Sequence, residues 1–142
     1  MKKPLDPLRL RLIWQTFGWV LVAIVTGLSL MPEPPSMPTI LSWDKGQHMA
    51  AYAALMYWFG MAFTRHWRWP KFLLAWGLLM EVIQGVGGLR TMDPYDMVAN
   101  LLGVAGGMLI LQTPCARFLS VLDKAIAGRG DSRIKHSGQR GS

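Results

Sequence analysis

The chain of 142 residues has a single cysteine, Cys115, which excludes an intrachain disulfide and a small fold held together by disulfides. It has no CxxC pair and no residues at the spacing of a structural zinc site. Acidic residues are also few: eight Asp and Glu against fifteen Lys and Arg give a net charge of +7. A basic balance of this size is typical of proteins that bind nucleic acid or an anionic membrane surface, and the positions of the charges decide between the two.

Charge is absent from long stretches of the sequence. Residues 12–31 carry none and are long enough to cross the roughly 30 Å hydrocarbon core at about 1.5 Å per residue. We predict four membrane-spanning helices, at residues 12–31, 44–63, 70–89 and 95–112. The shorter runs also suit core helices of a soluble protein, but four of them with seven Trp and ten Met favour a membrane protein. The first run also has features of a cleaved signal peptide, but its length favours a retained helix.

The lysines and arginines lie on alternate sides of the four predicted spans. All of them except Lys45 and Arg90 precede the first span, lie between the second and third spans or at the very start of the third, or follow the fourth. The positive-inside rule then places both termini in the cytoplasm. Because the net charge is explained as a signal of topology, we expect no nucleic-acid partner.

The two ends of the chain are predicted to lie outside the membrane domain of residues 12–112. Residues 1–11 form a basic cytoplasmic N-terminus. Thr113 suits a helix N-cap and Pro114 the first helical position. Apolar residues then recur at helical spacing: Phe118, Leu119, Leu122 and Ile126. Residues 113–127 are therefore predicted to form a short amphipathic helix on the cytoplasmic face, and residues 128–142 a disordered basic tail.

Polar residues gather at the predicted outer ends of three spans and in the outer loop between the last two. They are Asp44, Lys45, His48, Glu81, Gln84, Arg90, Asp93, Asp96 and Asn100. Residues four apart share a helix face, and polar groups within a span face the bundle interior because lipid cannot hydrate them. We therefore predict that these groups meet in a polar pocket that opens to the outside. The spacing of Gly103 and Gly107 further predicts the close approach of a neighbouring helix.

Some of these residues also have a purely structural interpretation. Asp44 opens a serviceable capping box, Asp93 precedes a proline at a good helix start, and Lys45 suits the membrane interface. Four others are harder to explain in this way: His48, Glu81, Gln84 and Asn100. A buried carboxylate such as Glu81 needs a cation, a donor or a proton, and Arg90 is the available cation on that side.

The spacing of these residues resembles a known family. Residues 44–55 (DKGQHMAAYAAL) are similar to the D-K-x-x-H-x-x-x-Y-x-x-L start of the second helix in the VanZ-like family, which is named for a glycopeptide-antibiotic resistance protein. Residues 81–107 (EVIQGVGGLRTMDPYDMVANLLGVAGG) resemble its E-x-x-Q and R-x-x-D-x-x-D-x-x-x-N-x-x-G block. The resemblance covers residues 12–112. It implies a four-helix protein of the bacterial cytoplasmic membrane, with the family's polar residues at the positions named above.

Three functions are consistent with such a site. The leading one is a non-enzymatic envelope protein in which Lys45 and Arg90 bind an anionic envelope precursor or lipid headgroup, with an effect on glycopeptide susceptibility implied by the resemblance. The second is a hydrolase or transferase acting on a lipid-linked substrate, with His48 as general base and Glu81 or Asp96 as acid. The third is a small transporter or flippase component. We expect no cofactor. His48 is the one histidine among these polar residues, which gives little support to a metal site, so none is predicted.

Overall fold

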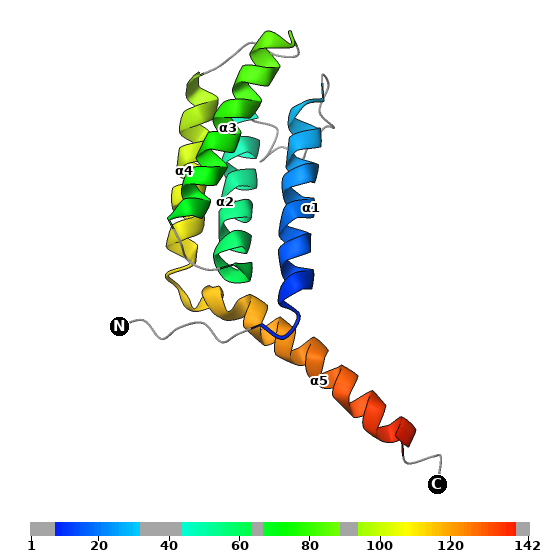
Figure 1. The fold of residues 1–142 in the computed structure, drawn as a ribbon. Helices are drawn as coiled ribbons and strands as arrows, with labels where there is room; N and C mark the ends of the chain where they lie inside the picture. Colours follow the sequence, from blue (N-terminus) through cyan, green and yellow to red (C-terminus); the bar gives the residue numbers. More distant parts are fainter. Residues whose placement is uncertain (1–7, 32–43, 64–66, 89–93, 139–142) are drawn as a thin grey trace.

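Helices make up the described part of the chain in the computed structural model (Figure 1). They are α1 (Arg11–Ser29), α2 (Asp44–Ala62), α3 (Arg68–Val86), α4 (Pro94–Ile110), the 3-10 helix η1 (Pro114–Arg117) and α5 (Phe118–Gly138). The structure describes residues 8–31, 44–63, 67–88 and 94–138, without the side chains of Asp44 and of residues 129–138. No strand occurs within these residues, so the prediction of an all-helical fold is confirmed for them.

The first four helices follow the four apolar segments of the sequence closely. α4 begins at Pro94, where the fixed φ of proline suits the first helical position. α3 ends at Val86, and Gly88 beyond it has a φ of 64°, a conformation that stops a helix and favours glycine. Local backbone preferences therefore set these ends of the two helices.

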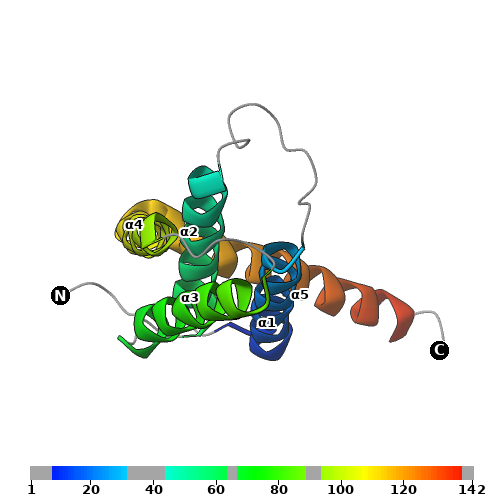
Figure 2. The ribbon, with the colours of Figure 1, turned by 90° about the horizontal axis from the view of Figure 1, so that it is seen from above.

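The helices α1 to α4 stand side by side as an antiparallel bundle, and α5 leaves the base of α4 at a large angle (Figure 1). Seen along the bundle, α2 lies between α4 and α1 (Figure 2), and its contact with α4 is the most extensive in the molecule. Residues Pro94–Ile110 and Pro114–Gly128 form an angle of 79°. Thr113 lies at this bend and is the N-cap of the next helix, as predicted, because its hydroxyl accepts a hydrogen bond from the N–H of Cys115.

Two glycines of α4 lie directly on the backbone of α2. A Cβ atom on Gly103 would collide with the carbonyl oxygen of Met49, and one on Gly107 would lie 2.6 Å from the carbonyl oxygen of Ala53. Any larger residue at either position would push the helices apart. The prediction that Gly103 and Gly107 permit close helix approach is confirmed.

Aromatic rings fill the end of the bundle where α1 and α3 begin and α2 ends. Phe59 is fully buried at the centre of this packing. Its ring centroid lies 4.8 Å from that of Phe63, which in turn lies 4.5 Å from that of Trp69. Such pairs contribute about 0.5–1.5 kcal/mol each beyond the burial of their area. This end of the bundle is therefore held mainly by ring packing.

The first half of α5 is tied to the start of α1 by the buried carboxylate of Asp123. This side chain accepts hydrogen bonds from the N–H groups of Arg9 (2.7 Å) and Leu10 (2.9 Å) and from the indole of Trp14 (2.7 Å). The N-cap residue of α1, Leu10, has no side chain that could cap the helix. Asp123 therefore supplies from α5 both the acceptor and the negative charge that a helix N-terminus favours.

The hydrogen bonds to Asp123 outweigh the cost of its burial. Burial by itself raises the pKa of this carboxyl group. The hydrogen bonds from Trp14, Leu10 and Arg9, together with the charge of Arg9, nevertheless hold the pKa of Asp123 below its ordinary value of 3.8. The folded protein therefore favours the ionised form of Asp123.

The far end of α5 differs from the prediction. A disordered tail was expected over residues 128–142, whereas α5 continues to Gly138. Extending a helix that already exists adds a hydrogen bond for each residue fixed, while starting a new helix is costly. The docked first half of α5 therefore favours continuation of the helix past residue 127.

One described helix, α1, is by itself long and apolar enough to cross a membrane, and 17% of its most apolar 18-residue window is buried. α4 and residues Pro114–Gly128 also meet this condition when they are taken together across their bend. α2 and α3 do not meet it, because charged and amide side chains near their ends lower the mean hydropathy. By length and composition alone, the described residues thus contain one or two candidate membrane spans.

Substitution of Gly103 tests the contact between α2 and α4. Gly103→Ala is expected to destabilise the protein by about 1–3 kcal/mol, because the new methyl group meets backbone that cannot rotate away. Gly106→Ala is the matched control, since a Cβ atom there has no atom within 4 Å and alanine favours the helix by about 0.5–1 kcal/mol. Thermal unfolding of both variants under the same conditions measures the difference. Equal Tm values would contradict the close contact.

Substitution of Asp123 tests the link between α5 and α1. A carboxyl group with a lowered pKa stabilises the folded state above its unfolded pKa, and this stabilisation is lost as the pH falls through the folded value. Asp123→Asn should therefore lower the free energy of unfolding by about 2 kcal/mol at neutral pH. The new NH₂ group would face N–H groups of Arg9, Leu10 and Trp14, to which it cannot bond. The wild type should lose stability as the pH falls below 3.8, because Asp123 then becomes protonated. The variant should lack this contribution, since it has no carboxyl group at this position. Denaturant unfolding at several pH values measures both effects, with Asp131→Asn as a control of equal charge change on the same helix.

Candidate functional site

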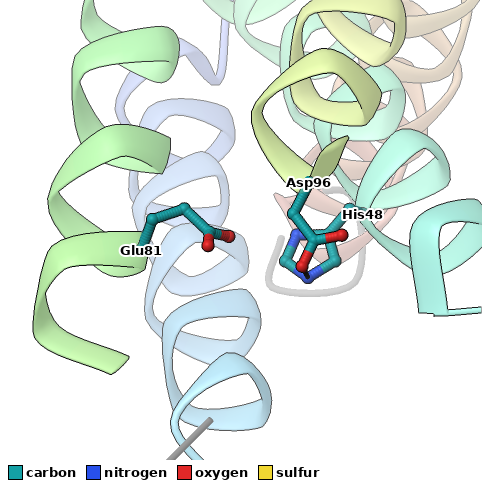
Figure 3. Close-up of side chains that lie close together, drawn as sticks. All are labelled: His48, Glu81 and Asp96. Carbon is teal, nitrogen blue, oxygen red and sulfur yellow. Dashed lines mark ion pairs between the residues drawn. The ribbon is translucent and has the colours of Figure 1, made fainter. Parts of the chain in front are cut away.

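Three titratable side chains meet from three helices at the end of the bundle opposite the aromatic packing. His48 lies near the start of α2, Glu81 near the end of α3, and Asp96 in the first turn of α4. One nitrogen or oxygen atom from each lies within 4.8 Å of the others. Figure 3 shows the Glu81 carboxylate pointing from α3 toward His48 and Asp96. We call these three residues the His-Glu-Asp cluster.

Asp96 is the centre of the charge interactions around this cluster. It is 5% exposed, and its place in the first turn of α4 suits a negative charge. The ammonium of Lys45 lies 3.5 Å from Oδ1, and Nε2 of His48 lies 3.9 Å from Oδ2. The Lys45 side chain is 28% exposed and lies 5.9 Å from the ring centre of Tyr95. Lys45 therefore forms the solvent-accessible rim of a cluster whose carboxylates are buried.

Asn100 orients the imidazole of His48 from the other side. Its amide oxygen lies 3.3 Å from Nδ1 of His48, and its side chain is 1% exposed. When Nδ1 carries the proton and donates to Asn100, the lone pair of Nε2 faces Asp96. In the other tautomer, Nε2–H faces Asp96 instead. The geometry thus prepares His48 either to accept a proton or cation at Nε2 or to donate there.

Gly77 lets α3 approach the other two helices beside the cluster. A Cβ atom on this glycine would lie 2.9 Å from Nδ2 of Asn100 and 3.0 Å from the hydroxyl of Tyr52. Tyr52 is 3% exposed, one turn after His48 on the same face of α2, as the spacing predicted. Because α3 comes this close, Glu81, one turn after Gly77, reaches the cluster.

Gln84 contacts α1 through its amide nitrogen. Its amide nitrogen donates to the carbonyl oxygen of Ser29 at 2.6 Å and lies 3.4 Å from the Ser29 hydroxyl. A turn or two earlier in α3, the indole of Trp76 donates to the hydroxyl of Thr26 at 3.0 Å. α1 thus offers polar acceptors at the depth of Gln84. The expectation that Gln84 also joins the other polar groups in one pocket stays a prediction.

The structure brings together five of the predicted site residues: Lys45, His48, Glu81, Asp96 and Asn100. The side chain of Asp44 and all of Arg90 and Asp93 lie outside the described residues. The expected pairing of Arg90 with Glu81 therefore stays a prediction. Sequence reasoning missed Ser29 as the partner of Gln84. The signal was present, since Ser29 ends the first apolar run and the predicted topology places it in the outer layer.

Charge and burial limit what the cluster can bind. By formal charge, the ammonium of Lys45 is outnumbered by the two carboxylates of Glu81 and Asp96. The two carboxylates are buried, with Glu81 at 2% and Asp96 at 5% exposure, so the inner part of the site favours a cation or a proton. The ammonium at the rim is the described group that can meet an anion there. The arrangement can therefore hold a cation inside and contact an anion at its edge.

The chemistry available at this site follows from the residues described above. Comparisons of the chain with protein-family models, with curated proteins and with solved structures found no match. The resemblance to the VanZ-like family therefore stays a prediction.

Proposed function

We propose that this chain is a VanZ-like integral membrane protein of the bacterial cytoplasmic membrane, and that it binds an anionic lipid headgroup or lipid-linked envelope precursor at the outer end of its bundle. In this proposal α1 to α4 cross the membrane, both termini are cytoplasmic and α5 lies along the inner face. The segregation of Lys and Arg supports this orientation. An effect on glycopeptide susceptibility would follow if binding changed access to an envelope precursor.

The outward faces of three helices support a lipid environment. Large apolar side chains are exposed along them: Leu12, Ile13, Phe17, Val20 and Ile24 on α1, Leu78, Leu79 and Val82 on α3, and Val98, Leu101, Leu102 and Leu109 on α4. Soluble monomers rarely expose contiguous apolar patches larger than a few hundred Å². Helices that present such faces around polar groups buried between them fit a bundle surrounded by lipid.

The position of Lys45 carries the proposal of anion binding. Asp96 holds its ammonium at the edge of the cluster, 3.5 Å from Oδ1, while more than a quarter of the side chain stays exposed. The ring of Tyr95 beside it is 69% exposed. A lysine and a tyrosine at the end of a span are the side chains that favour the headgroup layer, where the lysine can pair with phosphate. In this proposal Arg90, in the adjoining loop, adds a second cation able to bind phosphate through two hydrogen bonds.

The geometry of His48 favours one alternative, a hydrolase or transferase acting on a lipid-linked substrate. Its Nδ1 lies 3.3 Å from the amide oxygen of Asn100 and its Nε2 lies 3.9 Å from Asp96. An imidazole held between two polar partners suits a general base that takes a proton from water. In this alternative Lys45 would stabilise the negative charge that develops on the phosphate.

Binding of phosphate-bearing lipids tests the main proposal. The purified protein in nanodiscs is expected to bind a polyprenyl phosphate more tightly than phosphatidylcholine, measured by quenching of tryptophan fluorescence. Lys45→Met should weaken this binding about tenfold, which corresponds to roughly 1.4 kcal/mol for the lost ion pair. Lys71→Met is the matched control, because Lys71 is an exposed lysine at the other end of the bundle.

Two results would count against that proposal. Equal weakening by Lys45→Met and Lys71→Met would mean that only the overall charge attracts the lipid. Release of inorganic phosphate from a polyprenyl diphosphate by the wild type, abolished in His48→Gln, would instead favour the enzyme.

The single cysteine allows a test of the proposed topology. Cys115 is exposed between α4 and α5, so a membrane-impermeant maleimide should label it in inverted vesicles and not in intact spheroplasts. A Cys115→Ser chain carrying Tyr95→Cys should show the opposite pattern, because Tyr95 is exposed near the start of α4. Labelling of both positions from the same side would rule out a fourth span.

A further inference from the structure

We infer that the His-Glu-Asp cluster is a binding site for a divalent metal ion of the Zn²⁺ or Mn²⁺ type. The ligands would be Nε2 of His48 and one carboxylate oxygen each from Glu81 and Asp96. This inference goes beyond the proposed function, because it does not depend on which lipid the outer end of the bundle binds. The one histidine among the predicted site residues, His48, gave such a site little support. The convergence of three helices on one point changes that assessment.

The three ligand atoms lie slightly farther apart than they would around a bound metal ion. The three candidate ligand atoms lie within 4.8 Å of one another. Around a tetrahedral Zn²⁺ with bonds of about 2.0–2.2 Å, ligand atoms stand about 3.3–3.6 Å apart. The longest separation must therefore close by about 1.2–1.5 Å when the metal binds. Rotation of the Glu81 side chain, which has three flexible torsions and points toward the other two residues (Figure 3), can supply such a movement.

The surroundings of Asp96 independently indicate a cation. Its Oδ1 is buried and accepts no hydrogen bond from the described residues. The ammonium of Lys45 lies 3.5 Å from this atom, beyond the roughly 2.7–2.9 Å of a charge-assisted hydrogen bond. A buried carboxylate is costly when its lone pairs are poorly satisfied. A metal ion bound to Asp96 would remove that cost.

Asn100 provides the support that a metal-bound histidine requires. A ligating imidazole nearly always donates its second ring N–H to a carbonyl or carboxylate, which directs the other nitrogen at the metal. The amide oxygen of Asn100, 3.3 Å from Nδ1 of His48, is placed to accept that hydrogen bond. The lone pair of Nε2 then points toward Asp96 across 3.9 Å. Two electron-rich atoms facing each other in a buried site favour a cation between them.

The chemistry of the ligands selects the class of metal. One imidazole and two carboxylates form a nitrogen and oxygen set that suits Zn²⁺ and Mn²⁺ rather than metals that prefer thiolates. Three protein ligands leave at least one coordination position open. With the metal bound, the total charge of the cluster and Lys45 changes from negative to positive. The open position would then face a site that attracts an oxygen anion such as a phosphate.

Direct measurement of bound metal tests the inference. The full chain is purified without a histidine tag, stripped with a chelator and equilibrated with ZnCl₂ or, separately, MnCl₂. Elemental mass spectrometry is expected to find one ion for each chain. Asp96→Asn and His48→Gln should each lose stoichiometric binding, and Asn100→Leu should weaken it about tenfold through the loss of the orienting hydrogen bond.

The matched control removes the same residue type elsewhere. A chain carrying His66→Gln and His136→Gln should keep its metal, because neither histidine is one of the three proposed ligands. Equal loss in this control and in His48→Gln would indicate an adventitious ion only and would overturn the inference. A wild-type chain that binds no stoichiometric Zn²⁺ or Mn²⁺ would overturn it as well. This wild-type result decides the question even where a variant fails to fold, as checked by gel filtration and circular dichroism.

Lys45→Met separates this inference from the proposed function. Removal of the ammonium frees Asp96 for the metal, so binding of Zn²⁺ should become tighter. The same change should weaken the binding of a phosphate lipid. Opposite effects on the two ligands would support both proposals. Weaker metal binding in this variant would contradict the assignment of Asp96 as a ligand, whatever the lipid result.

Discussion

The backbone contact between α2 and α4 fixes the position of the polar groups in this protein. Gly103 and Gly107 lie on the carbonyl groups of Met49 and Ala53, so α4 has one depth and one rotation relative to α2. Helices usually pack with their axes 8–10 Å apart, and glycine at the contact allows the close end of this range. Asn100 is one turn from Gly103 and Asp96 two turns, and both therefore face His48. A wider contact would separate the imidazole from both partners.

The two ends of the bundle are stabilised by different interactions. At the base, aromatic rings pack between α1, α2 and α3, and two indoles donate hydrogen bonds: Trp14 to Asp123 and Trp58 to the carbonyl oxygen of Trp14. The other end has buried carboxylates, an imidazole and an amide beside the ring of Tyr52. Ring packing loses little when one contact shifts, whereas a buried polar cluster depends on every partner. The base therefore supports the polar end, where small displacements would be costly.

The helices and most of the site were predictable from the sequence, because both depend on local spacing. The apolar runs gave the four bundle helices, and a spacing of four residues placed His48 with Tyr52 and Asp96 with Asn100. Contacts between distant segments were less accessible. The hydrogen bond from Gln84 to Ser29 was not foreseen, since spacing along one helix does not identify the neighbouring helix. Asp123 carried a signal that was overlooked: it lies on the same face as Leu119, where a charged residue requires a partner.

The electrostatics of the cluster connect the two proposals. The described residues place Lys45 at the rim and two carboxylates beneath it, so their total charge opposes the entry of an anion. Lys45 lies beside Asp96 and offsets the charge of that carboxylate. A divalent ion below the rim would change the net charge of the site from negative to positive. The phosphate of a headgroup would then meet two cations, Lys45 at the rim and the metal ion beneath it. An anion site built over buried carboxylates is therefore physically consistent when a second cation, from Arg90 or from a bound metal, completes it.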